Sequence, residues 1–212
     1  MTGRRTWLHR TAAAVAAACL LTAPALADVT IKGDRAAYDE VVAAFKKLFS
    51  LPSYRMKMLL EGNQEAIVEM TPPDGVHMTG HMTNGNMEMV SVGGKSAMKI
   101  DAPGMPSGWR CSPATSAASR QPFTIPDPEK TAHEGTGTID VARGADTNIE
   151  GTPVHTYISN NSNGSKDTVY VGSQTGLPRR IISQKTGGQQ TMIDYYDYGA
   201  NIVIKLPPCA TP

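Results

Sequence analysis

The 212-residue chain carries 20 lysines and arginines against 19 aspartates and glutamates, so it is close to electrical neutrality. This balance provides no basic surface for nucleic acid or for anionic lipid headgroups, and we expect no nucleic-acid partner. The length suits a single domain with a sizeable core.

Residues 1–27 have the pattern of an export signal, with three arginines, an alanine-rich apolar run and a small-residue cleavage pattern ending at Ala27. The apolar run, roughly a dozen residues, is shorter than the ~20 needed to span a bilayer, so we expect no stable membrane insertion. The expected product is a periplasmic or secreted single domain of residues 28–212. The twin-arginine and general secretory routes both stay open, as does lipidation of Cys19.

Residues 34–50 carry the strongest helical pattern in the chain. Asp34 is placed to cap the N-terminus, and Pro52 prevents continuation beyond the last turn. The pattern predicts one amphipathic helix, whose single apolar stripe must be buried against another element. That stripe consists of Ala37, Val41, Phe45, Leu48 and Phe49.

After Pro52 the apolar period changes from about 3.6 to 2, which is typical of β-strands. Residues 112–135 interrupt this pattern, because they are rich in Pro, Ser and Ala, and we expect a long loop or short helix there. The fold class is therefore α+β and mainly antiparallel, with ten or eleven strands. The expected strands are 53–62, 65–71, 76–82, 86–92, 95–100, 137–142, 152–159, 167–173, 178–184, 190–199 and 201–206.

The segment 74–89 holds two histidines and four methionines within one expected hairpin. A turn centred on Asn84-Gly85 pairs His81 with Glu88, as an exposed polar pair. His77 and His81 then lie about 13 Å apart along one strand, too far to bind one ion as neighbours. We therefore expect no metal site, although methionine thioethers keep Cu(I) binding as an alternative. Strand alternation places Met78, Met82, Met87 and Met89 on one face, and the histidines on the other.

Methionine also recurs on the neighbouring strands, where a core with one fixed packing would favour Leu, Ile, Val and Phe. Because methionine is flexible and polarisable, it suits irregular or changing contents. One interpretation is an ordinary core packed on the helix; the other is a cavity between sheet and helix that accepts an acyl chain. The expected lining residues are Met56, Met58, Leu60, Val68, Met70, Met78, Met82, Met87, Met89, Met98, Trp109, Met192 and Tyr196.

Two further features of the sequence are a pair of cysteines and a tyrosine near the C-terminus. Cys111 and Cys209 remain after removal of the signal, and an even pair in an oxidising compartment predicts a disulfide. Tyr196 is expected on the face of Met192, where its hydroxyl could meet a ligand headgroup; an edge strand with amphipathic tyrosines is the alternative. The sequence contains no nucleophile-and-base motif, phosphate loop, zinc spacing or calcium loop, so we expect neither an enzyme nor a cofactor.

This organisation resembles the LolA-like superfamily of periplasmic lipoprotein carriers and lipid-binding envelope lipoproteins. The likeness spans about residues 36–206 and includes the Gly-Leu-Pro-Arg turn at 176–179 and the closing segment "YDYGANIVI". It implies an open half-barrel wrapped around the helix, with an apolar cavity for a lipid or lipoprotein acyl chain. The expected protein is a monomeric carrier, with an envelope protein as donor or acceptor. The alternatives are a Cu(I)-binding protein that uses residues 76–89, and a half-barrel sensor or scaffold that binds another protein.

Overall fold

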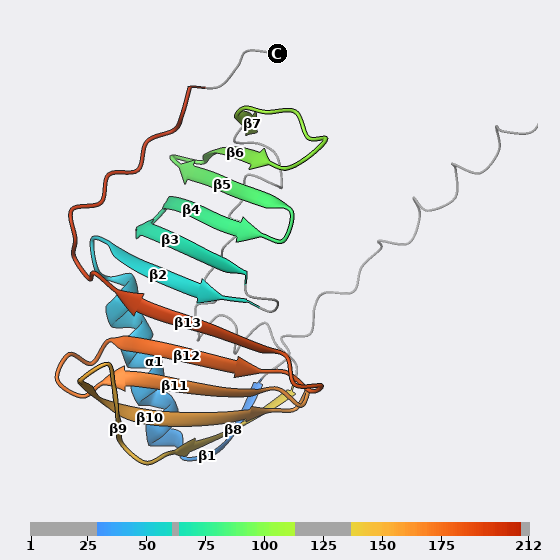
Figure 1. Cartoon of the computed structure of the whole chain (residues 1–212). Coiled ribbons are helices and arrows are strands. Elements are labelled where there is room, and N and C mark those ends of the chain that lie inside the picture. Colours follow the sequence, from blue (N-terminus) through green and yellow to red (C-terminus); the bar gives the residue numbers. More distant parts are fainter. Residues whose placement is uncertain (1–28, 61–63, 113–136, 209–212) are drawn as a thin grey trace, which may run out of the picture.

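The computed structural model describes residues 29–60, 64–112 and 137–208, which form one helix and a single 13-stranded sheet (Figure 1). The helix is α1 (Arg35–Phe49). The strands are β1 (Val29–Gly33), β2 (Tyr54–Leu59), β3 (Glu65–Thr71), β4 (Gly75–Met82), β5 (Gly85–Val92), β6 (Lys95–Asp101), β7 (Arg110–Ser112), β8 (Gly137–Arg143), β9 (Thr147–Ile149), β10 (Thr152–Asn161), β11 (Lys166–Gly172), β12 (Pro178–Gln184) and β13 (Gln190–Tyr196).

The strand order is β1-β8-β10-β11-β12-β13-β2-β3-β4-β5-β6-β7, with β9 paired to β10. All pairs are antiparallel except β1 with β8. The edge strands β1 and β7 lie at opposite ends of this order, so the sheet stays open. The expected α+β class, mainly antiparallel with one helix at the N-terminal side, is confirmed for the described residues.

Ten of the eleven expected strands are present, and the eleventh is wrong. Residues 201–208 form no strand; they run across the outer face of the sheet. Three short strands were not expected, namely β1, β7 and β9. The expected signal at 1–27, and all but the first residue of the expected loop at 112–135, lie outside the described residues. Among the described helices, none is long and apolar enough to cross a membrane.

Helix α1 begins and ends close to the residues that the capping and apolar pattern predicted. The Asp34 carboxylate accepts a hydrogen bond from the Ala37 amide at 3.0 Å, and the helix ends at Phe49 before Pro52. Its inner face packs on β1, β8, β10, β11 and β12. Figure 1 shows the helix behind this half of the sheet, while β4 to β7 extend beyond its end.

Two groups of buried side chains form the core. The first lies under the helix and consists of Ala37, Ala44, Val141, Tyr157 and Val171. At its margin Glu40 accepts hydrogen bonds from Tyr157 and Arg143. The second joins the end of the helix to the central strands and consists of Phe45, Leu48, Tyr54, Met56, Ala66, Val68, Met70, Val76, Met78, Met89, Leu177 and Tyr195.

Two hairpins test the expected turns. The β5–β6 turn is Gly93-Gly94, with positive φ of 59° and 71° and with the Gly93 amide donating to Asp74 at 2.9 Å. The β4–β5 turn is Thr83-Asn84 rather than Asn84-Gly85, because Met82 pairs with Gly85. A Cβ at Gly85 would lie 2.1 Å from the Asp101 carbonyl oxygen, so glycine is needed there for close strand approach.

Candidate ligand-binding face

One face of the central strands carries a continuous row of apolar side chains. In register across β13, β2, β3, β4, β5 and β6, this row consists of Tyr195, Met56, Val68, Met78, Met89 and Met98. Directly paired residues project to the same side of a sheet, so these side chains form one surface. All are buried except Met98, which is 39% exposed near the β7 edge. We call this surface the methionine face.

A second row on the methionine face has two small residues at its centre. The row consists of Ile193, Met58, Ala66, Gly80, Met87 and Ile100. Ala66 and Gly80 are paired neighbours, and a Cβ built on Gly80 would make ordinary contact with Ala66 Cβ at 3.7 Å. Two small, buried residues therefore separate Met58 from Met87 in this row.

A third row on the same face carries hydroxyl groups. It consists of Tyr54, Met70, Val76, Ser91, Ser96 and Ser112. Ser91 and Ser96 are buried, and Tyr54 has no exposed surface. Burial raises the pKa of the Tyr54 phenol, which therefore stays neutral. From β2 to β6 the methionine face thus has an apolar centre and a neutral polar border, and the paired residue of Met98 on β7 is the charged Arg110.

Aromatic rings connect this face to the helix. The Phe45 ring meets the Tyr195 ring edge-on with centroids 6.1 Å apart, and Tyr54 lies 6.5 Å from Tyr195. Such arrangements are typical of well-packed aromatic clusters. The end of α1 is thereby fixed to the first strands of the methionine face.

Most of the residues that the sequence assigned to a lining lie on the methionine face. These are Met56, Met58, Val68, Met70, Met78, Met87, Met89 and Met98. Leu60 follows the end of β2, and Met82 lies beside the β4–β5 turn, each 37% exposed. Whether these residues line a ligand stays a prediction.

Three of the assigned residues lie elsewhere. Met192 pairs with Leu59, and Tyr196 pairs with Arg55, so both project to the outer face. The alternation in β13 places Tyr195 inward instead. β13 is also a central strand between β12 and β2, so the edge-strand alternative is wrong as well. Trp109 precedes β7 and lines a pocket on the outer face.

The outer face of β3 to β5 carries a charged cluster centred on His77. Its Nδ1 lies 2.9 Å from Glu69 and its Nε2 lies 3.0 Å from Glu88. Burial opposes the charged ring, but the hydrogen bonds to the two carboxylates outweigh it, and the net pKa of His77 is raised. Arg55 extends the cluster, since it binds both Glu69 and Asp197.

The expected pair between His81 and Glu88 is wrong, because the turn lies one residue earlier. His81 faces Asn86, with 2.7 Å between their side chains, whereas Glu88 faces Thr79 and reaches His77. Among the described residues, no group of three or more His, Cys, Asp or Glu side chains could hold a metal ion.

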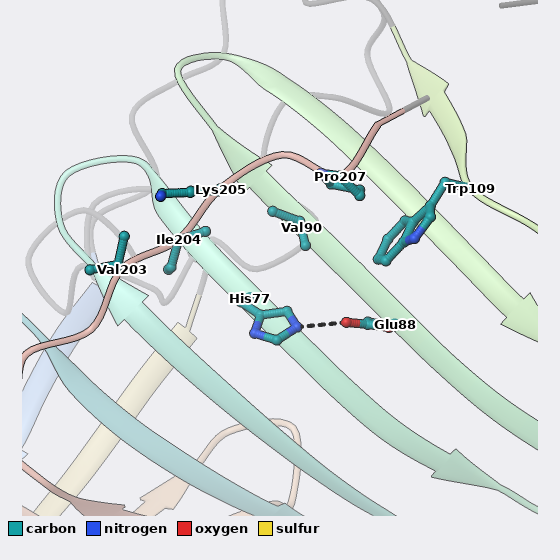
Figure 2. A pocket seen from close by; sticks show the side chains of 8 residues that line it. All are labelled: His77, Glu88, Val90, Trp109, Val203, Ile204, Lys205 and Pro207. Carbon is teal, nitrogen blue, oxygen red and sulfur yellow. Dashed lines mark hydrogen bonds and ion pairs between the residues drawn. The ribbon is translucent and has the colours of Figure 1, made fainter. Parts of the chain in front are cut away.

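The outer-face pocket lies beside this cluster, under residues 201–208 (Figure 2). It has a volume of about 380 Å³. The wall comprises His77, Glu88, Val90, Trp109, Val203, Ile204, Lys205 and Pro207. Cys111 lies on β7, whereas Cys209 lies outside the described residues, so their disulfide stays a prediction.

The described residues thus form an open, mainly antiparallel sheet with one helix on one face. No protein-family model matches the sequence. No curated protein sequence matches it either.

Solved structures share this fold at low sequence identity. The lipoprotein LppX of Mycobacterium tuberculosis is 11% identical, covers 82% of this chain and 100% of its own, and has a TM-score of 0.56. LprF of Mycobacterium bovis is 13% identical, covers 83% of this chain and 99% of its own, and has a TM-score of 0.51. A LolA superfamily protein of Nitrosomonas europaea also matches, at 11% identity over 81% of this chain and 94% of its own, with a TM-score of 0.27. LppX and LprF share the fold of this chain, which agrees with the open sheet and single helix expected from the sequence.

Proposed function

We propose that this protein is a non-enzymatic envelope carrier that binds a lipid or a lipoprotein acyl chain on the methionine face. The observation that carries the proposal is the uninterrupted apolar row from Tyr195 to Met98, in register across six strands. Such a row is long enough to lie along an acyl chain, because six strands span about 24 Å at roughly 4.8 Å spacing.

The side chains of this row suit a variable apolar ligand. Thioether side chains rotate about three bonds and pack on irregular surfaces at low cost. Each buried methylene of an acyl chain contributes ~0.8 kcal/mol, so a long chain supplies affinity without specific polar contacts. The small residues Ala66 and Gly80 keep side-chain bulk low beside the row. The likeness of fold to LppX, which is described as a lipoprotein, is compatible with an envelope role.

The cellular setting belongs to the same proposal. An export signal cleaved near Ala27 would deliver residues 28–212 to the periplasm, where an envelope protein would donate or accept the ligand. There the sheet would act as a half-barrel around its apolar contents, and the protein would work as a monomer.

The test is the ligand content of the protein purified from its own host without detergent. Native mass spectrometry is expected to show a lipid adduct that organic extraction removes. The extracted protein is then expected to bind the apolar dye N-phenyl-1-naphthylamine, and palmitoyl lipids are expected to displace it. Absence of both the adduct and dye binding, in a folded sample, would exclude the carrier function and leave the protein-binding scaffold as the better explanation.

A further inference from the structure

The hydroxyl of Tyr54 is an unexplained polar group inside the methionine face. The side chain has no exposed surface, and among the described residues its hydroxyl has no hydrogen-bond partner. Buried hydroxyls almost always have a partner, since removing one from water without compensation is costly. Tyr54 pairs with Met70, so its ring lies on the same side as Met56 and Val68.

The surroundings of this hydroxyl are neutral. On the methionine face, the described strands β2 to β6 present methionine, valine, alanine, isoleucine, glycine, serine and one tyrosine, but no charged side chain. Arg110, which pairs with Met98, puts a charge on this face at the β7 edge, five strands away from Tyr54. Arg55, Lys57 and Glu69 all project to the outer face. A charged headgroup placed here would lose its hydration without gaining an ion-pair partner, which costs far more than burying a neutral oxygen.

The hydroxyls also lie on one side of the apolar rows. Tyr54, Ser91 and Ser96 belong to one row, and the Met56–Met89 row lies two residues further along each strand, at about 6.6 Å. The Met58–Met87 row lies about as far again. The face is therefore amphipathic along the strand direction.

From this placement we infer that the ligand is a neutral acyl lipid, such as an acylglycerol, whose ester or hydroxyl oxygen accepts a hydrogen bond from Tyr54. This inference rests on the proposed function. The acyl chain lies over the methionine rows, and the polar end of the lipid lies at the border formed by Tyr54, Ser91 and Ser96. The site thereby selects acyl esters and alcohols over ionised fatty acids.

The experiment compares three palmitoyl-length probes in displacement of N-phenyl-1-naphthylamine from the delipidated protein. The probes are monopalmitin, 1-chlorohexadecane and ionised palmitate. The variant is Tyr54→Phe, and the matched control is Tyr196→Phe, which removes the same hydroxyl from the outer face. We expect Tyr54→Phe to weaken monopalmitin binding about 3- to 10-fold, the effect of one hydrogen bond, and to leave 1-chlorohexadecane unchanged. Tyr196→Phe should change neither.

Thermal unfolding of the lipid-free protein gives a second, independent readout. Because Tyr54→Phe removes a buried hydroxyl that lacks a partner, we expect the unfolding midpoint to rise. A lower midpoint would show that the hydroxyl is already bonded, and would overturn the inference. Equal loss for monopalmitin and 1-chlorohexadecane, no loss for either, or tightest binding of palmitate would overturn it while leaving the carrier function intact. Failure of the unmodified protein to bind any probe would overturn both.

Discussion

Gly80→Val distinguishes a ligand site from a solid core on the methionine face. Gly80 lies in the strand β4 beside Ala66, and its added Cβ would be in ordinary contact at 3.7 Å. If the space above it accepts a ligand, valine fills that space without displacing protein. The folded state should then gain about 0.5–1 kcal/mol, because glycine is the more flexible residue in the unfolded chain.

The same substitution should reduce ligand affinity. Valine adds three carbons and displaces two or three methylenes of an acyl chain, at ~0.8 kcal/mol each. The expected loss is therefore about 1.6–2.4 kcal/mol, or roughly 15- to 60-fold in Kd. Dye displacement measures the affinity and urea unfolding measures the stability. Thr79→Val is the matched control, because the neighbouring side chain projects to the outer face.

The opposite result has an equally clear meaning. If Gly80 faces solid protein, overpacking should destabilise the variant by about 1–3 kcal/mol. Destabilisation of that size, together with unchanged affinity for the dye, would refute the proposal that a ligand occupies this face.

Three further predictions concern the framework and the outer face. Asp34→Ala removes the helix cap and should cost about 1 kcal/mol in urea unfolding, whereas Asp39→Ala, which breaks only the exposed pair with Arg35, should cost under about 0.5 kcal/mol. The stabilising effect of His77 should be fully present below its ordinary pKa of 6.5 and be lost as pH rises through the raised pKa of the folded state. The pKa of Glu69 is lowered in the folded state, because burial opposes its charge but the bonds to His77 and Arg55 outweigh burial. The contribution of Glu69 to folding stability is therefore present above its ordinary pKa of 4.5 and is lost as pH falls through its lowered pKa in the folded state. His77→Gln should therefore flatten the alkaline decline of stability in pH-dependent unfolding, and a retained decline would exclude His77 as its source. Anaerobic Cu(I) titration against a competing chelator should show affinity no better than millimolar; tighter binding lost in Met78→Leu would favour the copper alternative.

The methionine face could be predicted because side chains at every second position of a strand lie on the same face, whatever the exact pairing with the next strand. The sequence placed the β4–β5 turn one residue too late, which shifts the paired residues by two positions. A shift of two leaves every side chain on the same face, whereas a shift of one would invert it. Met78 and Met89 were therefore assigned to the correct face although their pairing was wrong, and the histidines were assigned to the other.

The parts that the sequence did not predict depend on partners far away in the chain. β1 is held by a parallel pairing that joins Val29 to Gly137, which no local pattern encodes. In β13, two tyrosines are adjacent, and only the pairing of Tyr195 with Met56 decides which of them faces inward. Residues 201–206 do alternate apolar and polar side chains, as in a strand. They form no strand, however, and Ile204 instead lies over the outer face of the sheet.

The distribution of methionine is the strongest reason to distinguish the half of the sheet under α1 from the half beyond the end of the helix. Under α1, the core group around Val141 and Tyr157 contains no methionine, because the helix offers fixed partners and rigid side chains pack well there. Within residues 29–60, 64–112 and 137–208, the buried methionines all belong to the other group, which begins at the aromatic contact between Phe45 and Tyr195 and continues past the end of the helix. Side-chain flexibility thus increases where helical coverage ends. A core selected only for stability would not need this change, whereas a surface that exchanges one apolar occupant for another does.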